Sequence, residues 1–76
     1  MKLSVARSMA DHGRLVSAEL LRNPANHQQW FILVAESGGK SYIIANELDE
    51  TIVSTELEEL FKVLRELGFR KANVSL

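Results

Sequence analysis

A run of apolar residues that folds back on itself across two glycines constrains the fold of this chain more than any other feature. Residues 30–35 read Trp-Phe-Ile-Leu-Val-Ala, Gly38-Gly39 follows, and the chain returns as Tyr-Ile-Ile-Ala over residues 42–45. A Gly-Gly pair between two β-prone runs predicts a hairpin with a two-residue turn, because such turns need positive φ at their centre. With these glycines as the turn, Val34 lies opposite Ile43.

This register gives the hairpin two apolar faces, because successive side chains of a strand point to opposite sides of the sheet. One face carries Trp30, Ile32, Val34, Ile43 and Ala45. The other carries Phe31, Leu33, Ala35, Tyr42 and Ile44. One helix can cover only one of these faces, so the other needs a second cover. We therefore expect a homodimer, formed through the uncovered face or an edge strand. The candidate interface residues are Trp30, Ile32, Val34 and Ile43.

The size of the chain supports the same expectation. Its 76 residues are enough for one domain, residues 1–76, and it contains no cysteine that could form a disulfide or a thiolate metal site. A core this small rarely supplies more than about 3–5 kcal/mol of stabilising free energy, and many such domains add a disulfide, a metal site or a partner subunit. We expect no membrane span, because no apolar run approaches the roughly 20 residues that a span needs. With no signal peptide at its start, we expect a cytoplasmic protein.

The segment 56–67 has the pattern of an amphipathic helix. Its apolar residues fall on one helical stripe: Leu57, Leu60, Phe61, Leu64 and Leu67. Thr55 followed three residues later by Glu58 predicts a capping box at its start. Gly68 is placed to end the helix, with Phe69 folding back on Leu64.

The remaining segments complete the expected order. Ser4 predicts the cap of a short helix over 5–12 that Gly13 ends. Residues 14–22 fit a strand better than a helix, because residues 23–26 read as a turn into the hairpin. Residues 52–53 read as a short extended segment after a polar connection, and alternation over 72–76 predicts a last strand. The expected fold class is α+β, order (α)βββαβ: one small, mostly antiparallel sheet of three to four strands, with one long amphipathic helix packed on one face.

Charge is unevenly distributed along the chain. Residues 1–35 carry four basic and two acidic side chains, residues 36–59 one and seven, and residues 60–76 four and one. The net charge of −1 argues against a dedicated non-specific nucleic-acid binder, which is normally basic overall. Four cations flank the first and last predicted strands: Arg14, Arg22, Arg70 and Lys71. If those strands are neighbours and the cations meet at one end, they form a candidate phosphate-contacting patch.

Motifs of catalysis or of cofactor binding are incomplete. Gly38-Gly39-Lys40-Ser41 differs from a phosphate loop, because Val34 occupies the position of its first glycine and a strand follows instead of a helix. His12 and His27 have no metal-ligand spacing. The carboxylates near Glu47 do not follow a calcium-loop pattern. We therefore expect no catalytic residues, no cofactor and no metal.

The functional expectation follows from this inventory. We expect a non-enzymatic, dimeric interaction or regulatory accessory protein that acts by binding another macromolecule. The sequence does not identify that partner. The alternative is nucleic-acid binding by a basic end of the sheet.

Overall fold

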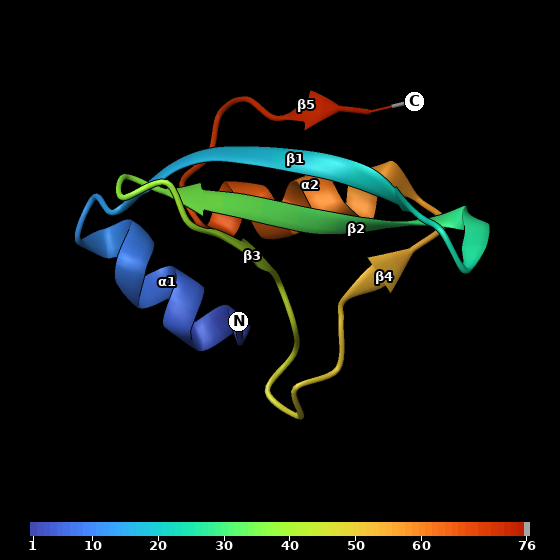
Figure 1. The fold of residues 1–76 in the computed structure, drawn as a ribbon, viewed down its shortest axis with the longest axis horizontal. Coiled ribbons are helices and arrows are strands. Elements are labelled where there is room, and N and C mark those ends of the chain that lie inside the picture. The colour runs from blue at the N-terminus through green and yellow to red at the C-terminus, as the bar shows by residue number, and fades with distance from the viewer. Residues whose placement is uncertain (76) are drawn as a thin grey trace.

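The computed structural model describes residues 1–75, which form two helices and one five-stranded sheet (Figure 1). The elements are α1 (Leu3–Asp11), β1 (Leu15–Asn23), β2 (Asn26–Glu36), β3 (Ser41–Ile43), β4 (Val53–Ser54), α2 (Leu57–Glu66) and β5 (Asn73–Val74). The α+β class expected from the sequence is confirmed. The sheet is larger than the three to four strands expected. Leu76, the end of the predicted last strand, lies outside the described residues.

The sheet is mixed, with strand order β3-β2-β1-β5. β1 and β2 form a long antiparallel hairpin, and β5 runs parallel to β1. β4 pairs with the first half of β2, on the edge that β3 occupies further along, so β3 and β4 are two short pieces of one edge. The chain between them, residues 44–52, leaves the sheet and returns. The strand prediction for residues 14–22 and the turn at residues 23–26 are confirmed.

The turn between β2 and β3 is one residue longer than predicted, and this changes the register. The amide of Gly39 donates to the Glu36 carbonyl at 3.0 Å, and the amide of Glu36 donates to the Lys40 carbonyl at 2.8 Å. Gly39 has a φ of +93°, so the loop is a β-turn followed by a left-handed glycine. Val34 therefore pairs with Tyr42, and the predicted pairing of Val34 with Ile43 is wrong.

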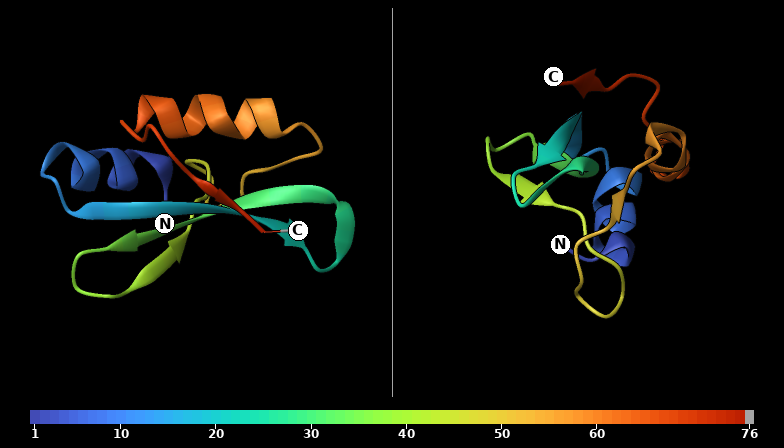
Figure 2. Two further views of the ribbon diagram at one scale, coloured as in Figure 1. Left: turned by 90° about the horizontal axis from the view of Figure 1, so that it is seen from above. Right: turned by 90° about the vertical axis from the view of Figure 1, so that its right-hand side faces the viewer.

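Both helices cover the same face of the sheet, as the two views of Figure 2 show. A single core cluster joins Ala6 of α1, Leu60 and Leu64 of α2, and the inward side chains of β1 and β2. The largest buried side chains of that core are Leu20, Ile32, Ile44, Leu60, Leu64 and Val34. The predicted stripe of the second helix thus faces the hairpin. The other face of the sheet has no helix over it within the described residues.

α2 ends as predicted but begins differently. The amide of Gly68 donates to the Arg65 carbonyl at 2.9 Å and that of Phe69 to the Leu64 carbonyl at 3.0 Å, while Gly68 has a φ of +90°. This is the glycine stop expected from the sequence. The predicted Thr55 capping box is wrong, because Glu56 is the N-cap. The Ser54 hydroxyl instead accepts the Glu56 amide at 2.9 Å.

The first helix also begins earlier than predicted. Lys2 is its N-cap and makes no side-chain cap hydrogen bond, so the prediction of Ser4 as the cap is wrong. Ser4 lies inside the first turn, where the carboxylate of Glu47 from the 44–52 segment holds it. Gly13, with a φ of +68°, follows the helix as expected.

Candidate interaction surface

The face of the sheet opposite the helices carries a continuous apolar surface within the described residues. We call it the open-face patch; it consists of Leu21, Phe31, Leu33, Ala35, Ile43 and Val53. Phe31 of β2 lies between Leu21 of β1 and Val53 of β4. Further along β2, Leu33 lies opposite Ile43 of β3. The patch therefore crosses four strands without a gap in the pairing.

The patch is accessible to a partner. Ile43 and Val53 expose 44% and 38% of their surface. A shallow hollow of about 270 Å³ lies beside Phe31, Ile43 and Val53, and Asn23, Pro24 and Thr51 form its rim. Of the described strand residues whose side chains point to this face, Glu19 is the one that carries a charge. It pairs with Leu33 of β2 on one side and Asn73 of β5 on the other, so the patch is continuous along β2 and has this one carboxylate beside it on β1. This is the composition of a surface that buries well against another apolar surface.

The four residues predicted for the interface do not share a face. Trp30, Ile32 and Val34 are in the core beneath the helices, with 6%, 0% and 0% exposure, and only Ile43 lies on the open face. The physical reason is the one-residue longer turn, which moves β3 side chains to the opposite side relative to β2. The sequence did indicate two apolar faces. The tertiary packing decides which of the two faces the helices cover.

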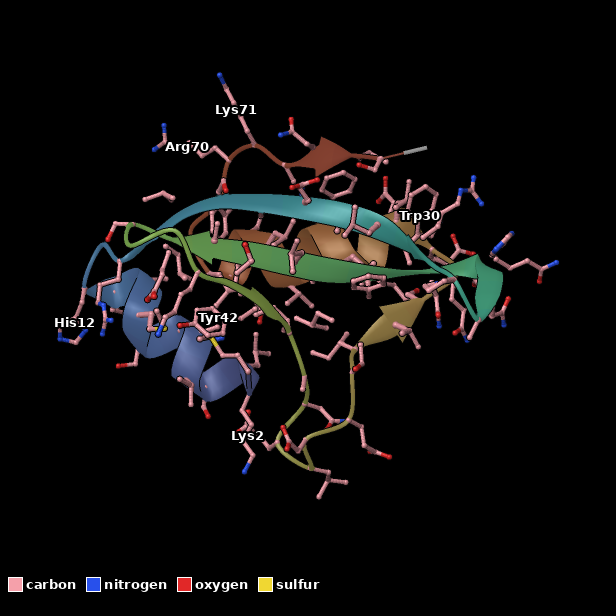
Figure 3. All side chains as sticks on the ribbon, in the orientation of Figure 1. Lys2, His12, Trp30, Tyr42, Arg70 and Lys71 are labelled. Carbon is pink, nitrogen blue, oxygen red and sulfur yellow. The ribbon has the colours of Figure 1, made fainter. Side chains whose placement is uncertain are left out.

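The cations predicted to gather at one end of the sheet do not do so. β1 and β5 are neighbours, as that prediction required. However, Arg14 precedes the nine-residue β1 and Arg22 lies near its far end, roughly 26 Å along at about 3.3 Å per residue. Arg14 approaches the Glu36 carboxylate at 3.5 Å. Only Arg70 and Lys71 remain together, beside the start of β1 (Figure 3).

Arg22 has a packing role. Its guanidinium lies 4.4 Å from the centre of the Trp30 ring and donates to the His27 carbonyl at 2.7 Å. A cation over an indole ring is a favourable contact that also shields the ring from water. Trp30 is thereby part of the core, and the base-stacking role that an exposed aromatic could play is not open to it.

The side chains of Tyr42, Glu47 and His12 each take part in a hydrogen bond. Burial raises the pKa of Tyr42 above its ordinary value of 10.0, and its hydrogen bond to Glu36 at 3.2 Å acts in the same direction. Two hydrogen bonds from Ser4 lower the pKa of Glu47. The ring of His12 bonds the Ser8 carbonyl at 2.7 Å. Within residues 1–75 no three side chains of His, Asp or Glu come close enough together to hold a metal ion.

Neither described helix is long and apolar enough to cross a membrane. Comparisons of the chain with protein-family models, with curated proteins and with solved structures found no match. The functional argument therefore rests on the surfaces of the molecule.

Proposed function

We propose that this chain is a small cytoplasmic, non-enzymatic interaction module that forms a homodimer through its open-face patch and binds a further macromolecule as a dimer. The observation that carries the proposal is the patch itself: apolar side chains from four strands with no helix over them in the described residues. Contiguous exposed apolar surface of this kind is characteristic of interaction sites.

A second copy suits this surface for two reasons. A two-fold contact places the same patch on both sides, so an apolar patch meets an apolar patch without requiring complementary charges. A typical interface takes about 800 Å² from each partner, about a sixth of the 5023 Å² surface of one chain. A chain of 8.5 kDa without disulfides gains much of its stability in this way.

The partner beyond the dimer would meet the surface that dimerisation leaves free. Acidic residues are concentrated between Glu47 and Glu59, and most of them are exposed. Their charge favours a basic partner and keeps the dimer soluble.

Sedimentation at micromolar concentration tests the dimer. We expect a species of twice 8.5 kDa for the natural sequence. Ile43→Glu places an unpaired carboxylate in the contact and should weaken association at least about tenfold. Leu48→Glu is the matched control, because Leu48 is 81% exposed outside the sheet and should leave association unchanged. A natural chain that stays monomeric throughout, or two variants that behave alike, would contradict the proposal.

Nucleic-acid binding is the second candidate, and it now rests on fewer residues. Arg65, Arg70 and Lys71 line one hollow of about 160 Å³ between α2 and the segment that follows it. Binding to their cations should weaken steeply with salt, because neutralised phosphates release counterions. A mobility-shift assay on single- and double-stranded DNA and RNA at two salt concentrations tests whether the chain binds nucleic acid in this way. Binding that is lost in Arg70→Ala/Lys71→Ala would rank this candidate first.

A further inference from the structure

The two edges of the sheet differ in how well they are closed. On the β3 side, the N-terminal residues pair with the chain: the Met1 amine donates to the Ile43 carbonyl at 2.8 Å, and the Leu3 amide donates to the Ala45 carbonyl at 2.8 Å. On the β1 side, β5 supplies partners only for Glu19 and Leu20. Residues 15–17 therefore have no strand partner on that side among the described residues. An edge of this kind is a template for an additional strand.

A groove follows the unpaired part of this edge. It has a volume of about 380 Å³. Residues 15–18 of β1 form one side of it and residues 68–73, which connect α2 to β5, form the other. Val16, at a register shift of β1, is 60% exposed in the groove, and Phe69 and Ala72 are half-buried. The groove thus combines a strand edge with apolar side chains, as sites for extended peptides do.

The groove is also positively charged. Arg70 and Lys71 both line it and are both exposed, and none of its lining residues carries a carboxylate in the described structure. Figure 3 shows both side chains above the start of β1. Arg65 lines the neighbouring hollow on the α2 side together with the same two cations and one acidic residue, Glu58. A segment that binds in the groove would meet Arg70 and Lys71, and their charge favours acidic side chains.

We propose that the open edge of β1 binds an acidic, extended segment of another protein as an added strand. The segment pairs its main chain with residues 15–17, places carboxylates near Arg70 and Lys71, and sets an apolar side chain against Val16. A peptide fits this edge better than a nucleic acid, because the main-chain N–H and C=O groups of residues 15–17 without a strand partner can pair with another main chain. The site lies at the sheet edge and is independent of the open-face patch, so either proposal can fail alone.

The test uses the full chain labelled with ¹⁵N and two pools of capped hexapeptides. One pool alternates glutamate with randomised apolar residues, and the other alternates lysine with the same residues. We expect the glutamate pool to shift the amide signals of residues 15–18 and 70–73. The lysine pool should bind at least about tenfold more weakly, because it meets like charge.

Two further comparisons separate strand addition from simple charge attraction. Arg70→Gln/Lys71→Gln should weaken binding about fivefold or more, as two rim charges are lost. The control Lys2→Gln/Lys40→Gln removes equal charge on the β3 side of the sheet and should bind normally. A glutamate pool with every main-chain nitrogen methylated has no N–H group left to donate to β1 from either edge, so its binding as an added strand should be lost.

The proposal is overturned if the glutamate pool leaves residues 15–18 unshifted, or if the lysine pool or the methylated pool binds equally well. It is also overturned if both double variants bind alike. A single-stranded oligonucleotide that shifts the same amides at lower concentration than the glutamate pool would assign the groove to nucleic acid instead.

Discussion

The carboxylate of Glu47 holds the first turn of α1 through Ser4, a residue 43 positions away in the sequence. One oxygen accepts the Ser4 amide at 3.1 Å and the other accepts the Ser4 hydroxyl at 2.6 Å. A free amide and the positive end of a helix are both favourable neighbours for a carboxylate. The contact joins the 44–52 segment to the N-terminal helix.

The Ser4 contact predicts an acid-sensitive fold. Because both hydrogen bonds lower the pKa of Glu47 in the folded chain, its ionised form stabilises folding at neutral pH. That contribution is present above the unfolded value, here 4.5, and is lost as the pH falls through the lower folded pKa. Glu47→Gln should lower the melting temperature at neutral pH and reduce the loss of stability on acidification.

Thermal melts of the natural chain and of Glu47→Gln, from neutral pH to below 4.5, measure this effect. Glu50→Gln is the matched control, because Glu50 lies in the same segment and bonds Asn46 rather than α1. If Glu47→Gln and Glu50→Gln melt alike at every pH, the contact does not contribute to stability.

The core of α2 gives a second prediction. Leu64 is 2% exposed between α2 and the sheet. Leu64→Ala removes buried methyl groups and leaves a void, so it should cost about 2–5 kcal/mol of unfolding free energy. Leu48→Ala makes the same chemical change at a position that is 81% exposed, and should stay within about 0.5 kcal/mol of the natural chain. Urea denaturation measures both, and a loss under about 1 kcal/mol for Leu64→Ala would contradict the packing.

The β2–β3 turn gives a third prediction. Gly39 has a φ of +93°, where a side chain is strained, whereas Gly38 does not have a positive φ. Gly39→Ala should therefore cost about 1–2 kcal/mol. Gly38→Ala is the control, since a Cβ there meets only the Glu36 carboxylate, at an ordinary 3.7 Å. Urea melts in which the two variants lose equal stability would show that Gly39 does not need its left-handed conformation.

The sequence by itself determined the features that depend on neighbouring residues. The 3.6-residue periodicity of α2 and its glycine stop could be read because both arise within one or two turns of helix. The hairpins could be read because turn residues and β-prone runs lie side by side in the chain. That the hairpin is apolar on two sides, and so leaves one face of the sheet to be covered, follows from the same local alternation.

Only the tertiary structure decided which face of the hairpin packs against the helices and which stays open. Two-residue and three-residue glycine turns are close alternatives locally, and choosing between them moved Ile43 away from the face of Val34. The start of α1 could not be predicted from neighbouring residues either, because its first turn is held by Glu47 from a distant segment. The placement of both helices on one face, and the partly open edge of β1, depend on the packing of elements far apart in the chain. The free energy that stabilises this helix placement and strand order comes from contacts between elements far apart in the chain, which no local sequence pattern encodes.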